Sequence, residues 1–349
     1  MPDWLCPSPP DPKIPLMARK QRKKQAEIAK PEMFTSLFSR ESMSGIEKIS
    51  PDGQSIKPTF AQELVPPRQR SAASKRVSQA PVFAITSGKG GVGKTNVVAN
   101  LAAALALRSK RVMVIDADLG LANLDLFLGV RPVYTLADFF TGLVALDEII
   151  ISNRDGILLL PGACGVQEVT ALRYDQKIAL LTELDALSHE VDLVLVDTGS
   201  GISDAVTYFA TSAQEIVVVV TPEPSSMTDA YALVKVLASG YHEKRFYILA
   251  NSVSDKAEAR RLFDALSGTA LRFLNASLDF FGWIPRDPQL IQAVARSRLI
   301  VTEASDAPSA KAFAVMAERL IEMTSARVRI KGNVQFFFRR MLEGGRAAK

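Results

Sequence analysis

A glycine-rich run carries the residue types and spacing that bind phosphate. Residues 88–95 fit the pattern G-x-x-x-x-G-K-[ST], in which glycines without a β-carbon let the backbone curl and point its N–H groups at phosphate oxygens. Lys94 is expected to reach the β- and γ-phosphates of a nucleotide, and the Thr95 hydroxyl is expected to ligate Mg²⁺. The predicted phosphate contacts are Gly88, Gly90, Gly91, Val92, Gly93, Lys94, Thr95 and Asn96.

Carboxylates follow two apolar runs elsewhere in the chain. Asp116 and Asp118 come directly after one run, and Asp197 ends another. A hard oxygen ligand at the end of a buried strand can hold Mg²⁺ directly or through water. We expect Asp116 and Asp197 to join Thr95 in the magnesium shell. This donor set predicts hydrolysis of a phosphate bond by positioning and electrostatics, without a covalent intermediate.

The apolar runs and the stretches between them predict the scaffold for these residues. Short apolar runs indicate strands that are buried on both faces, and helical patterns separate them. This alternation predicts an α/β fold, with a mostly parallel central sheet, helices on both faces and the ligand at the carboxyl ends of the strands. The predicted strands are 82–86, 111–116, 157–160, 193–197, 216–221 and 246–250. The predicted helices are 96–108, 177–188, 227–239, 255–266 and 308–323.

Composition limits the class of protein. The chain has 349 residues, of which 48% are hydrophobic, so we expect a sizeable core. No apolar run approaches the roughly 18 residues that a membrane span needs. Cys6 and Cys164 are the only cysteines, which fits neither a disulfide framework nor a zinc site and suits a reducing cytoplasm. The net charge of +5 permits contact with acidic lipid or nucleic acid without arguing strongly for either.

Three regions differ in composition. Residues 1–80 are rich in Pro, Ser, Lys, Arg and Gln, and we expect a largely disordered extension. Residues 81–325 carry the alternating strands and helices of the predicted nucleotide-binding domain. Residues 326–349 form a tail with a different pattern.

The tail predicts an amphipathic helix that docks on membranes. Apolar side chains recur at i, i+3, i+4, i+7 and i+8 and so share one helix face, while arginines supply cations for anionic lipid head groups. The alternative is a helix packed on its own domain, and the helix can alternate between the two states. One such helix binds a membrane weakly, whereas two joined in a dimer bind much more tightly. The predicted membrane contacts are Val334, Phe337, Phe338, Arg339, Arg340, Met341 and Leu342.

A second lysine inside the glycine-rich run narrows the class of nucleotide-binding protein. Lys89 completes the deviant Walker A pattern K-G-G-x-G-K-[ST], and residues 82–323 resemble the P-loop ATPase family of MinD, ParA, the nitrogenase iron protein and the arsenite-pump ATPase. The resemblance implies ATP and Mg²⁺ as cofactors, slow hydrolysis and a homodimer in the ATP-bound form. It also implies that Lys89 crosses to the partner subunit's nucleotide. The alternative for Lys89 is an ordinary solvated lysine.

The same resemblance assigns further roles. Residues 116–125 match the family's switch I pattern D-x-D-x-G-x-x-N-L-D, which makes Asp118 the general base or the residue that positions the attacking water, and Asn123 part of the switch. Residues 197–202 would form the switch II turn. Asn251 matches a place where the family holds adenine, because an amide pairs with donor and acceptor edges of the base. The other predicted base contacts are Pro285, Arg286 and Asp287.

The tail narrows the resemblance to the FlhG group, also called FleN, of MinD-like ATPases that limit flagellar number and placement. Residues 332–342 resemble that group's endings, and Gly93 to Val98 resemble its P-loop continuation. Implied partners are the GTPase FlhF, the flagellar switch proteins or a flagellar transcription activator, at the inner face of the cytoplasmic membrane. The group's N-terminal motif D-Q-A-x-x-L-R is not found, since residues 24–30 keep only Gln-Ala and a final basic residue. Stimulation of FlhF is therefore not predicted.

Three alternatives stand beside that interpretation, and the sequence argues against two of them. A MinD-like regulator of the division site shares every feature of the phosphate site. An iron–sulfur carrier needs a pair of cluster cysteines, which Cys6 and Cys164 do not form. A ParA-like DNA partition ATPase would bind duplex non-specifically, although the amphipathic tail speaks against it. The late basic residues that leave DNA binding open are Arg296, Arg298, Lys311 and Arg319.

Overall fold

The structure is a computed structural model that describes residues 80–118, 124–134, 138–139, 142–162 and 190–325. The chain divides between Lys75 and Arg76, and every described residue belongs to the second unit. The expected N-terminal extension, the helix predicted at 177–188 and the amphipathic tail lie outside the described residues. Within the described ranges, no helix has both the length and the apolar character that crossing a bilayer requires.

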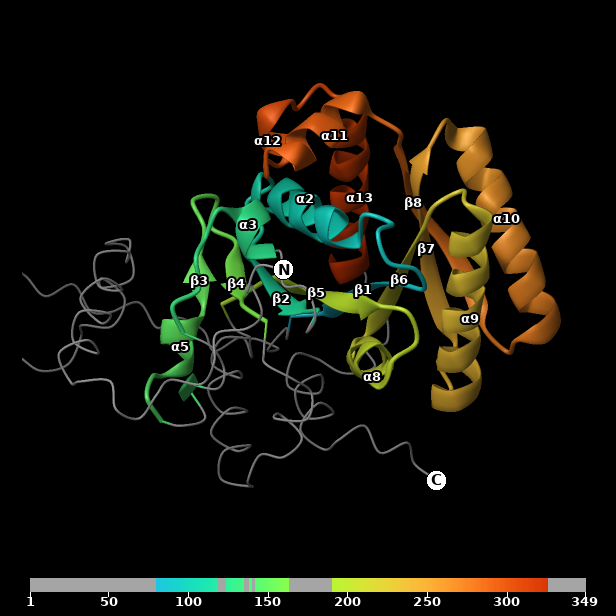
Figure 1. Ribbon diagram of the computed structural model, residues 1–349, viewed down its shortest axis with the longest axis horizontal. Coiled ribbons are helices and arrows are strands. Elements are labelled where there is room, and N and C mark those ends of the chain that lie inside the picture. Colours follow the sequence, from blue (N-terminus) through green and yellow to red (C-terminus); the bar gives the residue numbers. More distant parts are fainter. Residues whose placement is uncertain (1–79, 119–123, 135–137, 140–141, 163–189, 326–349) are drawn as a thin grey trace, which may run out of the picture. The chain divides into compact units, whose positions relative to one another are not determined.

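A sheet of eight strands forms the centre of the described unit (Figure 1). The strand order is β3-β4-β2-β5-β1-β6-β7-β8, with β3 and β4 antiparallel and the other neighbours parallel. The predicted α/β fold with a mostly parallel sheet is therefore confirmed. The strands are β1 (Val82–Ser87), β2 (Val112–Ala117), β3 (Ile151–Ser152), β4 (Leu158–Leu160), β5 (Leu193–Ser200), β6 (Glu215–Val220), β7 (Arg245–Val253) and β8 (Ser277–Pro285).

Helices cover both faces of this sheet (Figure 1). Side chains of β1 alternate between the faces, so that Phe83 and Ile85 join one core with α2, α12 and α13, whereas Val82 and Ala84 join another with α8. Helices α9 and α10 pack on the α8 side, over β6 and β7. The helices are α2 (Lys94–Ala106), α3 (Leu124–Leu128), α5 (Leu146–Ile149), α8 (Asp204–Ser212), α9 (Pro224–Tyr241), α10 (Lys256–Phe273), α11 (Pro288–Ala295), α12 (Ile300–Glu303) and α13 (Pro308–Ser325).

Strand β8 is the main element that the sequence does not predict. It lies at the edge of the sheet, and Asp279 and Gly282 interrupt its apolar run. The structure also extends β5 to Ser200, whereas the resemblance places a turn from Asp197 onward. The extension occurs because β2 and β1 continue to pair with β5 beyond Asp197.

Asp287 fastens α11 to α13. One carboxylate oxygen accepts a hydrogen bond from the Gln289 N–H at 2.9 Å, and the other accepts from the Ser309 N–H at 3.1 Å and the Ser309 hydroxyl at 2.6 Å. Burial raises the pKa of Asp287, but these hydrogen bonds to the ionised form outweigh it and hold the pKa below its ordinary value of 3.8. The ionised carboxylate therefore stabilises the fold.

Replacing Asp287 with asparagine is expected to lower the free energy of unfolding by about 1–3 kcal/mol near neutral pH, because an amide turns one acceptor oxygen into a donor that faces the Ser309 N–H. The folded pKa is depressed, so the carboxylate's contribution is complete above the unfolded value of 3.8 and is lost as pH falls through the folded value. Urea unfolding across this range measures the difference, which should shrink in acid. Ser309→Ala, which removes one donor, should cost less. A difference that does not change with pH would contradict this assignment.

Candidate nucleotide-binding site

The glycine-rich run connects β1 to α2 at the carboxyl edge of the sheet. Gly91 and Gly93 have φ angles of 76° and 86°, in the left-handed region that other residues enter only with strain. Gly88 lies so close to α9 that an added β-carbon would stand 2.2 Å from the backbone of Asp229. Helix α2 begins at Lys94, so the N–H groups of its first turn add to those of the loop at the expected phosphate site. The predicted strand, loop and helix are therefore all present.

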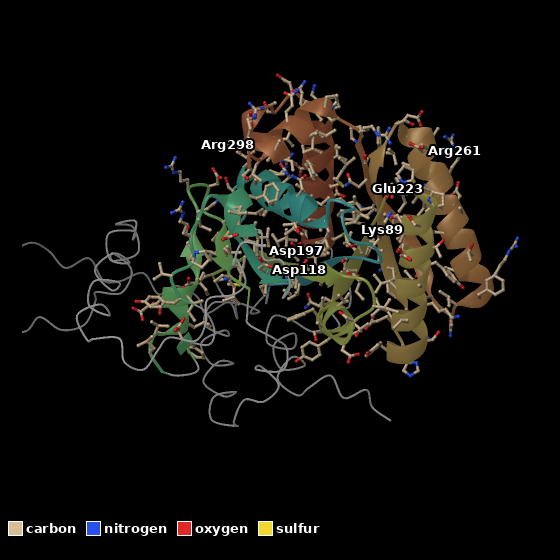
Figure 2. All side chains as sticks on the ribbon, in the orientation of Figure 1. Lys89, Asp118, Asp197, Glu223, Arg261 and Arg298 are labelled. Atoms are coloured by element: carbon tan, nitrogen blue, oxygen red, sulfur yellow. The ribbon has the colours of Figure 1, made fainter. Side chains whose placement is uncertain are left out.

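Lys94 meets two of the predicted carboxylates. Its side chain is buried, and Nζ lies 2.6 Å from Asp197 Oδ1 and 3.8 Å from Asp118 Oδ2. The Thr95 side chain favours the ionised form of Asp197, as Lys94 does, and so opposes the rise in the pKa of that carboxyl. Asp116 and Asp197 are direct partners in the β2–β5 register, which brings the two strand ends together. Figure 2 shows Asp118 and Asp197 side by side near the centre of the sheet.

The site concentrates negative charge. Burial, followed by repulsion from Asp197, raises the pKa of Asp116 to about 7, although the Asp118 N–H and Lys94 oppose this. Burial also pushes the pKa of Asp197 upward, while the Lys94 ammonium opposes that shift. Asp116, Asp118 and Asp197 thus share one buried lysine. The chemistry of these oxygens, together with the Thr95 hydroxyl, suits a hard divalent cation such as Mg²⁺.

The described side chains supply only part of a metal shell. Among them, no group of three or more His, Cys, Asp and Glu side chains is arranged to hold a metal ion. Mg²⁺ commonly takes one or two protein carboxylates and completes its shell with water and substrate phosphates. Thr95, Asp116 and Asp197 therefore fit a Mg²⁺ ion that arrives with a nucleotide.

The end of β5 lies against both the loop and Asp118. A β-carbon on Gly199 would stand 3.8 Å from Asp118 Oδ1, and one on Gly90 would stand 3.4 Å from Ser200 Oγ. The Gly201 N–H donates to the Ser87 carbonyl at 2.9 Å, which ties the turn after β5 to the end of β1. Residues 199–201 are therefore close enough to the phosphate loop for a shift of the loop to displace them.

Lys89 is held within its own subunit. Its Nζ lies 2.6 Å from Glu223 Oε2 and donates to the Ser225 hydroxyl at 2.8 Å, at the start of α9 (Figure 2). The sequence alone does not predict this role for Glu223 or Ser225. A signal was present, because both follow β6, and every parallel strand of this sheet ends at the same edge.

Asn251 lies beside the phosphate loop. Its Nδ2 donates to the Val92 carbonyl at 2.7 Å, and its Oδ1 accepts from the Ser252 N–H at 2.9 Å. An amide offers two N–H donors and two lone pairs, so one donor and one acceptor position remain for a base. The base contact predicted for Asn251 thus remains a prediction that fits its position.

The other predicted base and loop residues are placed as follows. Arg286 is exposed, and its backbone N–H donates to the Val253 carbonyl, which sets residues 285–286 beside the end of β7. Asp287 uses its carboxylate within the fold, as described above. Asn96 lies in the first turn of α2, with its Nδ2 buried and without a hydrogen-bond partner among the described residues. Asn123, both cysteines and the membrane contacts at 334–342 lie outside the described residues.

A parallel sheet with a glycine loop, a buried lysine and strand-end carboxylates at one edge defines a P-loop nucleotide-binding domain. Residues 83–300 match the CobQ/CobB/MinD/ParA nucleotide-binding domain. The chain therefore belongs to this family, as the sequence analysis predicts.

Three relatives illustrate the match. Antiactivator FleN of Pseudomonas aeruginosa is 39% identical over 75% of this chain and 93% of its own length. The flagellum site-determining protein YlxH of Helicobacter pylori is 34% identical over 63% of this chain and 74% of its own. The structure of the septum site-determining protein MinD from Pyrococcus horikoshii, complexed with Mg-ADP, superposes with a TM-score of 0.55 at 25% identity, covering 72% of this chain and 100% of that one.

Proposed function

We propose that this chain is a Mg²⁺-dependent ATPase that works as a slow molecular switch in regulating flagellar number and placement. The observation that carries the catalytic part is the pair of buried side chains Lys94 and Asp197, with the half-buried Thr95 and Asp118 beside them at the phosphate loop. The flagellar part is supported by the name of the YlxH relative, a flagellum site-determining protein, and by the identity to FleN, the name of the group that the tail resembles.

Each side chain has a task in this proposal. The loop N–H groups bind phosphate oxygens, and Lys94 exchanges its carboxylate partners for the β- and γ-phosphates. Thr95, Asp116 and Asp197 hold Mg²⁺, which neutralises charge on the phosphates. Asp118 orients the attacking water or accepts its proton. The closeness of Asp118 to Gly199 then lets residues 199–201 respond to loss of the γ-phosphate.

Nucleotide state controls assembly in this proposal. Lys89 leaves Glu223 and Ser225 and binds the nucleotide of a second subunit, so that ATP joins two copies into a homodimer. Glu223 is 61% exposed and Lys89 is 35% exposed, and an ion pair in such contact with water contributes little stability. The exchange of partners therefore costs little free energy.

The MinD-like division-site role is the second candidate. Septum site-determining protein MinD of Synechocystis sp. supports it with 32% identity over 68% of this chain, which is below the 39% over 75% of FleN. FlhF, the flagellar switch proteins or a flagellar transcription activator are the partners that the first candidate proposes. A pull-down from cells with the Asp118→Ala and Lys94→Ala proteins tests both, because the two variants hold different nucleotide states. Enrichment of division proteins in place of flagellar ones would overturn the flagellar proposal.

In this proposal the C-terminal tail is the part of the chain that binds the membrane. Truncation after Lys331 is expected to abolish ATP-dependent binding to anionic vesicles, because it removes the apolar face and the arginines that recognise lipid. ATP hydrolysis should survive, since the tail follows the domain that holds the phosphate site. Vesicle co-sedimentation measures binding, with neutral vesicles as the control. Unchanged binding after truncation would show that the tail is not the anchor.

DNA binding finds little support in the surface charges. Arg296 pairs with Glu303 at 2.8 Å, Lys311 lies 3.9 Å from Asp306, and Arg319 donates to the backbone carbonyls of β8. Figure 2 places Arg298 and Arg261 on opposite sides of the described unit, so they do not form one patch. A gel shift with duplex DNA, with and without ATP, should show no complex. A salt-sensitive complex would favour the ParA-like role.

A further inference from the structure

Asn251 fastens the phosphate loop to strand β7. Its Nδ2 donates to the Val92 carbonyl at 2.7 Å, across 159 positions of sequence. The second half of the amide is also held, because Oδ1 accepts from the Ser252 N–H at 2.9 Å. A β-carbon on Gly93 would lie 2.7 Å from the same Nδ2, so the loop closes directly against this side chain. Asn251 is thus a bridge with both ends fixed.

The backbone around Asn251 is shaped for this bridge. Ser252 has a φ of 57°, in the left-handed region, and the pairing of β7 with β8 shifts in register between Ala250 and Val253. A non-glycine residue keeps such a conformation only where the surrounding structure fixes it. The Val253 carbonyl accepts the Arg286 N–H at 2.7 Å, which secures the far side of the irregularity.

The bridge controls the direction of a phosphate donor. The Val92 carbonyl and the Gly93 N–H belong to one planar trans peptide and point in opposite directions. Holding the carbonyl on Asn251 therefore fixes the direction of the Gly93 N–H, one of the donors in the loop. A glycine with a φ of 86° has little conformational restriction of its own, so the restraint has to come from outside the loop.

We propose that Asn251 is a positioning residue for the phosphate loop, in addition to any contact it makes with the base. The inference rests on the proposed binding of nucleotide to residues 88–95. Its consequence is that the base site and the phosphate site share one side chain. A base that pairs with the remaining N–H and lone pair of Asn251 would further restrict the amide and, through Val92, the loop.

The test uses a ligand without a base. Titration of the full chain with Mg-tripolyphosphate and with Mg-ATP measures both affinities, by calorimetry at a temperature where every variant is folded. Asn251→Ala is expected to weaken tripolyphosphate binding by about fivefold, the value of one hydrogen bond. Ser252→Ala is the matched control, because it leaves the backbone donor to Asn251 intact, and it should change neither affinity. If Asn251→Ala weakens ATP binding alone, Asn251 acts only on the base and the inference fails.

A second variant covers the case in which Asn251→Ala does not fold. Asn251→Asp keeps the side-chain volume and the acceptor for Ser252, but places an oxygen against the Val92 carbonyl, so tripolyphosphate binding should fall by at least about fivefold. Ser252→Asp controls for the added charge and should have a smaller effect. Unchanged tripolyphosphate binding in Asn251→Asp overturns the inference. If the unaltered chain binds neither ligand, the proposed nucleotide site itself is wrong, which is a different result.

Discussion

Replacing Lys94 with methionine is expected to lower ATP hydrolysis by a factor of at least about 100, because the ammonium that neutralises developing charge on the phosphates is gone. Methionine nearly preserves the volume of the buried side chain. The variant should also be less stable without nucleotide, by up to about 3–5 kcal/mol, since it leaves Asp197 buried without its cation. Phosphate release and thermal unfolding measure the two effects.

Mg²⁺ separates the electrostatic cause of this instability from a packing defect. If unpaired carboxylates destabilise the Lys94→Met protein, millimolar Mg²⁺ should raise its unfolding temperature more than that of the unaltered protein. Lys235→Met, on the exposed side of α9, provides a control that loses a lysine without touching the site. Hydrolysis that persists in Lys94→Met would remove the basis of the proposed activity.

The phosphate site is predictable because its determinants are local. A left-handed φ at Gly91 and Gly93 demands glycine, and the run from β1 into α2 fixes the loop within a few residues. The strand-end carboxylates are predictable for a similar reason, since parallel strands bring their carboxyl ends to one edge of the sheet. Asp116 and Asp197 meet because the β2–β5 register pairs them, and apolar runs indicate both strands.

Contacts between distant segments were not predictable in the same way. The position of Glu223 and Ser225 after β6 places them at the same edge of the sheet as the loop, but the sequence does not indicate that α9 packs against Gly88 closely enough to reach Lys89. Strand β8 was missed because an edge strand tolerates polar and glycine interruptions that a central strand does not. The structural task of Asp287 depends on Ser309, which lies 22 residues further along the chain.

Replacing Lys89 with alanine is expected to separate nucleotide binding from dimerisation. Lys89 binds Glu223 and Ser225 and not the aspartates of the magnesium site. The Lys89→Ala monomer should therefore still bind Mg²⁺ and a non-hydrolysable ATP analogue. Loss of a charge-assisted contact across a subunit interface should weaken dimerisation by at least about 30-fold. Light scattering with the analogue gives the mass, and calorimetry gives the affinity. The control is Lys311→Ala, on the exposed face of α13, which should change neither dimerisation nor nucleotide affinity.

Glu223→Gln should have the opposite effect. The Lys89–Glu223 pair competes with any second subunit for the same ammonium group, so weakening it frees Lys89 and lowers the nucleotide concentration at which dimers form. The shift should be modest, about two- to fivefold, because both side chains are already in contact with water. Opposite changes in the two variants are the result that an exchange of partners by Lys89 predicts. A solvated lysine without a role predicts no change in either, and a lysine that only secures α9 predicts the same change in both.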